Sequence, residues 1–180
     1  MALINSNNYF IIPGLGNSGE DHWQTFFERT ADNFQRIHQK EWDAPNCNDW
    51  ISTIEKAISG YEPASVIVIA HSLGCSAIAS WAAKYHTKIK GAMLVAPSDI
   101  ESVAYNFPAT GFSPISKEKI NFKTIVVASE NDPWVSLNRA KYFSDNWGSD
   151  FINIGDAGHI NAASGYGQWK QGLEILKMLD

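Results

Sequence analysis

One serine stands where it could act as a nucleophile. Residues 66–70, Val-Ile-Val-Ile-Ala, predict a buried strand that runs directly into His71, Ser72, Leu73 and Gly74, and small residues suited to a helix start follow. A strand, a sharp turn and a helix would push the serine Oγ clear of the sheet. The same turn would place the Leu73 N–H at a helix N-terminus, where it can hold an oxyanion. The pattern predicts Ser72 as the nucleophile of an acyl transfer and Leu73 as an oxyanion donor.

The segment around Ser72 also has a simpler interpretation. It has the form Ala-x-Ser-x-Gly where Gly-x-Ser-x-Gly is usual, so its first small position carries a methyl group. Serine is a common helix N-cap, and five residues alone do not separate an N-cap from a nucleophile. The buried strand before Ser72 favours the nucleophile.

Two later loops carry residues that could complete a catalytic triad. His159 follows the last strand-like run on a glycine-flanked loop that can reach over the strand ends, so it is predicted as the general base. Asp132, at the tip of the preceding such loop, is predicted to orient that base and to stabilise its protonated form. The other candidates for the acid are Asp99, which is the second choice, Glu130 and Asp156.

A glycine-rich segment, residues 13–19, follows the first strand-like run and predicts the second oxyanion donor. The preferred donor is the backbone N–H of Leu15, and the close alternatives are Gly14 and Gly16. The same segment matches Gly-x-Gly-x-x-Gly, a dinucleotide-binding pattern. Glu20 and Asp21 follow it, and two carboxylates would repel a pyrophosphate at a helix start. Dinucleotide binding is therefore the weaker hypothesis.

Strand-like and helix-like segments alternate along the chain. Short apolar or β-branched runs predict six strands, at residues 9–12, 34–38, 66–70, 92–96, 124–128 and 151–154. Helical spacing of apolar residues predicts helices at residues 20–32, 48–59, 73–85, 137–147 and 168–179. This alternation is typical of right-handed βαβ units wound into a parallel sheet with helices on both faces.

These observations predict a single α/β domain over residues 1–180, of the α/β-hydrolase class. We expect a six-stranded, mainly parallel sheet of strand order 2-1-3-4-5-6. One connection, residues 97–121, is too long for an ordinary loop in a compact domain. It is predicted either as a small cap or as a surface loop that packs its aromatic side chains on the core.

Composition and charge exclude several classes of protein. The net charge is −5, so no basic surface is expected for nucleic acid. Residues 1–10 lack the features of a signal peptide, and the longest strongly apolar run, residues 66–70, is too short to cross a membrane. Cys47 and Cys75 are expected as free thiols, which indicates a cytoplasmic location. Metal-ligand motifs are missing, so we expect no metal and no organic cofactor.

Several short segments together resemble a known family. They are residues 13–18, 22–24, 42–45, 71–74, 128–133 and 158–165, which include Pro-Gly-Leu-Gly-Asn-Ser, His-Trp-Gln and His-Ser-Leu-Gly. In these segments the chain resembles the small single-domain serine hydrolases grouped with retinoblastoma-binding protein nine and the YdeN-type bacterial proteins. The resemblance implies the triad Ser72, Asp132 and His159, with an esterase-like or peptidase-like activity. The resemblance gives no evidence for a protein partner of this chain, so protein partners stay unknown.

The sequence as a whole predicts a serine hydrolase that cleaves a small ester or amide through an acyl-enzyme intermediate. Trp23 and Trp134 are predicted as walls of the substrate pocket, because they lie close to the oxyanion segment and to the acid in the sequence. Asn161 and Ser164 are expected to hold the histidine loop, and His71 to pack or hydrogen-bond locally. The alternative from a different class is a non-catalytic protein-binding module on the same fold.

Overall fold

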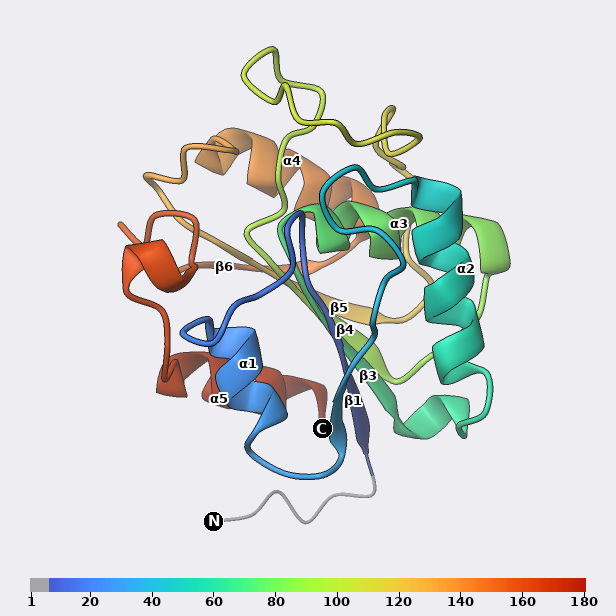
Figure 1. The fold of residues 1–180 in the computed structure, drawn as a ribbon. Helices are drawn as coiled ribbons and strands as arrows, with labels where there is room; N and C mark the ends of the chain where they lie inside the picture. The colour runs from blue at the N-terminus through green and yellow to red at the C-terminus, as the bar shows by residue number, and fades with distance from the viewer. Residues whose placement is uncertain (1–6) are drawn as a thin grey trace.

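The fold is built on a six-stranded sheet. A computed structural model describes residues 7–180, so the expectation about a signal peptide concerns in part residues 1–6, which lie outside the described residues. The strands are β1 (Asn8–Ile12), β2 (Phe34–Arg36), β3 (Val66–His71), β4 (Gly91–Val95), β5 (Lys123–Ala128) and β6 (Asp150–Asn153). Their order is β2-β1-β3-β4-β5-β6, and every neighbouring pair is parallel (Figure 1). The predicted order is confirmed.

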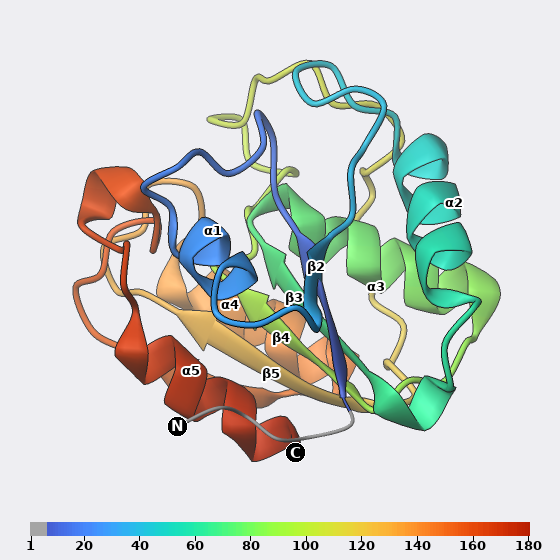
Figure 2. The same ribbon diagram turned by 60° about the horizontal axis from the view of Figure 1, so that its bottom comes forward.

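Helices cover both faces of the sheet. They are α1 (Trp23–Glu28), α2 (Cys47–Ile58), α3 (Leu73–Tyr85), α4 (Leu137–Trp147) and α5 (Lys170–Leu176), with single 3-10 turns at Pro63–Ser65, Ala162–Ser164 and Lys177–Leu179. The helices α2, α3 and α4 pack on one face, and α1 and α5 pack on the other (Figure 2). No helix within residues 7–180 is long and apolar enough to cross a membrane.

This coverage explains the apolar central strands. Every residue of β3 and β4 is buried, as expected for parallel strands with helices on both sides. Successive side chains of a strand point to opposite faces, so Val68 packs toward α3, whereas Ile69 packs toward α1. The core therefore has two layers, one on each side of the sheet.

Two of the predicted helices are longer than the helices observed. The predicted helix at residues 20–32 is α1, which begins only at Trp23 because the His22 side chain accepts a hydrogen bond from Gln24 N and caps it there. The predicted helix at residues 168–179 is α5 followed by the turn Lys177–Leu179. In both segments the spacing of apolar residues continues beyond the helical backbone. The ends of the helices are set by capping groups, which this spacing does not show.

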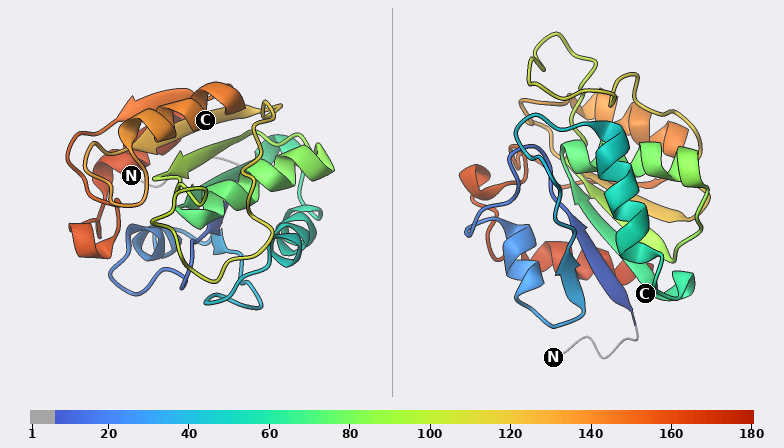
Figure 3. Two further views of the ribbon diagram at one scale, coloured as in Figure 1. Left: turned by 90° about the horizontal axis from the view of Figure 1, so that it is seen from above. Right: turned by 45° about the vertical axis from the view of Figure 1, so that its right-hand side comes forward.

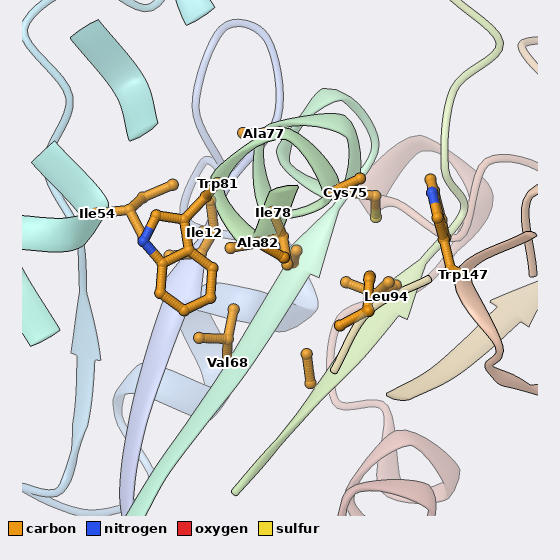
Figure 4. Packing of buried hydrophobic residues seen from close by; sticks show 14 of the residues in the cluster. Ile12, Ile54, Val68, Cys75, Ala77, Ile78, Trp81, Ala82, Leu94 and Trp147 are labelled. Carbon is orange, nitrogen blue, oxygen red and sulfur yellow. The ribbon is translucent and has the colours of Figure 1, made fainter. Parts of the chain in front are cut away.

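The N-terminal end of α3 lies unusually close to the sheet. Side chains of α3, including Ile78 and Trp81, pack over β1 and β3 (Figure 4). At Gly74 a Cβ atom would lie 2.6 Å from the Ile12 carbonyl oxygen and 2.8 Å from that of Pro13. Only glycine allows this approach, which brings the turn at Ser72 beside the segment that follows β1.

Residues 97–121 form an irregular loop, without a helix or strand, that arches over the end of the sheet where the strands finish (Figures 1 and 3). Its second half is anchored in the core by Phe112, Ile115 and Ile120. Its first half carries Tyr105 and Phe107 toward Trp134, with ring centroids 5.1 Å apart for the latter two. The second half therefore packs on the core, whereas the aromatic side chains of the first half lie against Trp134.

The close approach at Gly74 predicts a large cost for an added methyl group. Gly74→Ala should lower the free energy of unfolding by about 2 kcal/mol or more, because the atoms that the methyl group meets are backbone atoms that cannot step aside. Gly60→Ala is the matched control, since nothing lies within 4 Å of a Cβ atom there. Its effect should stay within about 0.5 kcal/mol. Urea unfolding measures both, and equal effects would contradict the packing described here.

Candidate active site

The backbone turns sharply at Ser72, between β3 and α3. Its φ and ψ are 55° and −123°, a region that residues with side chains seldom adopt. The Ser72 N–H donates to Val95 O at 3.0 Å, and its side chain makes no capping hydrogen bond to α3. The interpretation of Ser72 as a simple N-cap is therefore not supported. The turn instead leaves Oγ free to point toward the neighbouring loops.

Three side chains from three loops form one hydrogen-bonded chain. Ser72 Oγ lies 2.9 Å from His159 Nε2. His159 Nδ1 lies 2.8 Å from Asp132 Oδ2 and 3.0 Å from Oδ1. The structure thus brings together the nucleophile, base and acid that the sequence predicts, although the three residues are far apart along the chain.

The carboxylate fixes which ring nitrogen carries the proton. The Asp132 side chain is fully buried, and its Oδ1 also accepts a hydrogen bond from Trp134 N at 2.8 Å. An ionised carboxylate can only accept, so His159 Nδ1 is the donor. His159 Nε2 is left unprotonated and accepts the Ser72 hydroxyl proton. This is the tautomer that a general base requires.

The alternative acids are engaged elsewhere. Asp99 accepts two hydrogen bonds from Arg139, at 2.9 and 3.0 Å, and does not pair with His159. Glu130 accepts from the Asn153 side chain at 2.8 Å, and Asp156 is exposed to solvent. Only Asp132 among the candidates contacts the imidazole.

Two backbone N–H groups near Ser72 donate to no acceptor within residues 7–180. Leu73 is the first residue of α3, so its N–H has no acceptor within the helix. The Leu15 N–H donates to no acceptor within residues 7–180, and Leu15 lines the cleft, whereas the Gly16 N–H is taken by Trp42 O at 2.9 Å. Together Leu73 and Leu15 can hold an oxyanion.

The glycine-rich segment is shaped for this contact with the serine and not for a dinucleotide. A Cβ atom on Gly14 would lie 2.8 Å from Ser72 Cβ, so the segment rests directly on the serine turn. A dinucleotide-binding glycine turn places the pyrophosphate at the N-terminus of the next helix. Here that helix begins only at Trp23, well past Gly19. The strand order also differs from the order 3-2-1-4-5-6 of the dinucleotide-binding fold.

Hydrogen bonds tie the acid loop to the histidine loop. Asn131 Oδ1 accepts from Gly158 N at 2.7 Å, and Ser129 Oγ accepts from Ala157 N at 2.9 Å. On the far side of His159, Ser164 Oγ accepts from His159 N at 3.2 Å and donates to Asn161 Oδ1 at 2.9 Å. Asn161 and Ser164 thus hold the histidine loop as expected.

His71, next to the nucleophile, has a local structural role. Its Nε2 lies 2.9 Å from the His159 carbonyl oxygen, so it donates a hydrogen bond to the backbone of the base. Complete burial, with further contributions from His159 and His22, lowers the pKa of His71 well below its usual value. His71 is therefore neutral at physiological pH and supports the loop without taking part in proton transfer.

A cleft of about 240 Å³ opens onto the serine. Its lining residues are Leu15, Ser72, Ser98, Tyr105, Phe107, Trp134 and His159. Trp134 stands in this wall, as predicted. The prediction for Trp23 is wrong, because its ring is fully buried on the α1 side of the sheet and its Nε1 donates to Ile160 O at 2.8 Å. Through this hydrogen bond Trp23 supports the histidine loop from the core of the protein.

One hydroxyl group beside Ser72 was not predicted from the sequence. Ser98 is buried, and its Oγ lies 2.7 Å from Ser72 Oγ. Because the Ser72 proton is directed at His159, Ser98 is the donor in this contact. Its position on the loop that follows β4, at the edge where the carboxyl ends of the strands meet, was the signal that could have identified it. Within residues 7–180, no group of three or more His, Cys, Asp or Glu side chains could hold a metal ion.

Comparisons with known proteins identify a matching family and similar structures. Residues 9–178 match the model of the family described as serine hydrolase. A putative YdeN-like hydrolase from Pectobacterium atrosepticum is 34% identical, with a TM-score of 0.83 over 96% of this chain and 91% of that one. The ydeN gene product of B. subtilis is 18% identical, with a TM-score of 0.78 over 96% and 98% of the two chains.

A more distant likeness concerns the fold alone. A predicted CIB-like hydrolase from Thermoplasma acidophilum is 16% identical, with a TM-score of 0.68 over 99% of this chain and 88% of that one. Comparison with curated proteins finds no match. The family model covers nearly the whole chain, and the YdeN-like hydrolase from Pectobacterium atrosepticum is similar over almost the same length. The chain therefore belongs to the serine hydrolase family, on an α/β-hydrolase fold.

Proposed function

We propose that the protein hydrolyses a small ester or amide through an acyl-enzyme intermediate on Ser72. The observation that carries this proposal is the continuous hydrogen-bonded chain from Ser72 Oγ through His159 to the buried carboxylate of Asp132. A serine that served only structure would not need an imidazole in this tautomer at 2.9 Å.

In the first step, Ser72 Oγ forms a bond to the substrate carbonyl carbon while its proton moves to His159 Nε2. The carbonyl electron pair moves onto oxygen, and the N–H groups of Leu73 and Leu15 stabilise the oxyanion. Each such donor contributes about 3 kcal/mol to transition-state stabilisation. Asp132 stabilises the imidazolium that forms.

The second half of the reaction releases the products. The oxyanion collapses, the bond to the leaving group breaks, and His159 returns its proton to that group. Water then attacks the acyl carbon while its proton moves to His159 Nε2, and the same N–H groups stabilise the second oxyanion. When this intermediate collapses, the bond from the acyl carbon to Ser72 Oγ breaks, His159 returns the proton to Oγ, and the carboxylic acid leaves. Ser98, which donates to Ser72 Oγ at 2.7 Å, also stabilises the alkoxide character that develops on that atom.

The dimensions of the cleft favour short acyl groups. Its volume of about 240 Å³ lies below the range of roughly 300–1,000 Å³ that is typical for drug-sized ligands. The aromatic side chains of Tyr105, Phe107 and Trp134 close one side of the cleft. The loop that carries Tyr105 and Phe107 has no helix that could extend the cleft into a tunnel. A long acyl chain would leave most of its methylene groups in water.

A fluorophosphonate probe should label wild-type protein on Ser72, because the probe reacts with serines activated by a base. The Ser72→Ala variant should not be labelled. Ser76→Ala is the matched control, since Ser76 is a buried serine of the same helix and lies outside the site. Mass spectrometry of the labelled peptide identifies the site. Labelling that persists in Ser72→Ala would overturn the proposal, and complete absence of labelling in wild type would favour the non-catalytic binding module.

The acid assignment predicts a contrast between two aspartates. Asp132→Asn should lower kcat by roughly 10⁴-fold, because an amide in this position favours the wrong imidazole tautomer. Asp99→Asn removes a carboxylate that pairs with Arg139 and not with His159, so its effect on kcat should be far smaller. Steady-state hydrolysis of p-nitrophenyl acetate measures both. Equal losses would show that the acid is wrongly assigned.

The size of the cleft predicts the dependence on acyl length. For p-nitrophenyl esters of increasing length, the Ser72-dependent kcat/KM should be highest for short acyl chains. Each further methylene should gain much less than the roughly 0.8 kcal/mol of full burial. A steady rise in kcat/KM from acetate to long chains would reveal a deep apolar channel and contradict this interpretation of the cleft.

A further inference from the structure

A second, smaller hollow opens beside the serine. It has a volume of about 120 Å³ and shares Leu15, Ser72 and His159 with the aromatic cleft. Its remaining lining residues are Gly14, Asn17, His22, His71 and Asn161. The site thus has an aromatic branch and a polar branch that meet at the nucleophile. The mechanism described above uses no side chain that belongs to the polar branch alone.

His22, which lines the polar branch, carries an unpaired hydrogen-bond donor. Its Nδ1 accepts from Gln24 N at 3.2 Å, so in the neutral ring the proton is on Nε2. The residue is 6% exposed, and Nε2 has no hydrogen-bond partner within residues 7–180. Burial, assisted by Arg36 and His159, lowers the pKa of His22 to about 3, so the ring is neutral at physiological pH. A buried N–H without an acceptor is costly, which points to an acceptor supplied from outside the chain.

The two amide side chains of this branch also present donors. Asn17 Oδ1 accepts from Ser18 N and from Arg36, both at 2.8 Å. Asn161 Oδ1 accepts from Ser164 N at 3.0 Å and from Ser164 Oγ at 2.9 Å. Both oxygens are therefore occupied, and neither NH₂ group donates to a partner within the described part of the chain. The groups left for a ligand are N–H donors.

The electrostatics of the branch favour an uncharged acceptor. Arg36, whose side chain is 6% exposed, is paired with Glu28 at 2.8 Å, so it supplies no unpaired positive charge to the hollow. A carboxylate would lie close to Ser72, where the oxyanion forms, and like charges would oppose each other. A carbonyl or ether oxygen can accept from these donors without that repulsion.

We propose that the polar branch is a specificity subsite in which His22 Nε2–H donates a hydrogen bond to a second, uncharged oxygen of the substrate. This inference rests on the proposed hydrolase function and narrows the substrate class. The preferred ester or amide carries a carbonyl or ether oxygen a few bonds from the scissile carbonyl, on either the acyl or the alcohol side. Purely hydrocarbon esters leave the His22 N–H unpaired.

Two matched substrate pairs test the subsite. On the acyl side, p-nitrophenyl levulinate has a ketone where p-nitrophenyl pentanoate has a methylene group. On the alcohol side, methoxyethyl acetate has an ether oxygen where butyl acetate has a methylene group. For each pair, the ratio of kcat/KM for the oxygen-containing ester to kcat/KM for its hydrocarbon partner is compared among variants. Comparison among variants cancels the intrinsic reactivity of each ester.

Two substitutions separate the donor from the helix cap. His22→Asn keeps an acceptor that caps α1 but is too short to place a donor where Nε2 lies. His22→Gln reaches farther and can restore the donor. In at least one pair the ratio should fall about tenfold in His22→Asn and recover in part in His22→Gln. Thermal unfolding of each variant checks that the fold is retained.

Ratios that are the same in wild type and His22→Asn for both pairs would overturn the subsite and show that the N–H binds ordered water only. That outcome differs from failure of the hydrolase function itself. If Ser72→Ala hydrolyses pentanoate and butyl esters as fast as wild type, the proposed function fails and the subsite fails with it. Ser72-dependent hydrolysis with unchanged ratios removes only the subsite.

Discussion

The backbone conformation of Ser72, with a φ of 55°, is the constraint on which the rest of the site depends. Such a conformation costs on the order of 1–3 kcal/mol and persists only where the surroundings hold it. Here Gly14 packs against the serine Cβ from one side, and Gly74 brings α3 onto the carbonyl groups at the end of β1. The strained turn leaves Oγ free of the helix and directs it to His159 Nε2 at 2.9 Å.

The segment His22-Trp23-Gln24 connects this turn to the rest of the site. Gln24 Nε2 donates to Ile12 O at 3.2 Å and to Ile69 O at 3.1 Å, which ties together the ends of β1 and β3. Trp23 donates to the backbone directly after His159, and His22 contributes to the wall of the polar branch. Three adjacent residues thus support the serine turn, the histidine loop and the proposed subsite.

Patterns along the sequence predicted those features of the fold that depend on neighbouring residues. The apolar runs identified the strands, and the α/β-hydrolase class predicted their order. The loops after the strands predicted that Ser72, Asp132 and His159 lie at one edge of the sheet. Patterns could not show which face of α1 is buried, so Trp23 was misplaced in the cleft. The position of Ser98 after β4 was a usable signal, but its contact with Ser72 depends on the distance between separate loops. The free Nε2 of His22 depends on such distances too, and no spacing along the chain encodes them.

The central claim is that Ser72 carries the acyl group during turnover. Rapid acid quenching of the protein during hydrolysis of p-nitrophenyl acetate, followed by intact and peptide mass spectrometry, tests it most directly. The account predicts one added acetyl group, located on Ser72, that appears with the burst of nitrophenol and is missing in Ser72→Ala. An acetyl group on another residue that forms and decays at the turnover rate, with Ser72 unmodified, would contradict it.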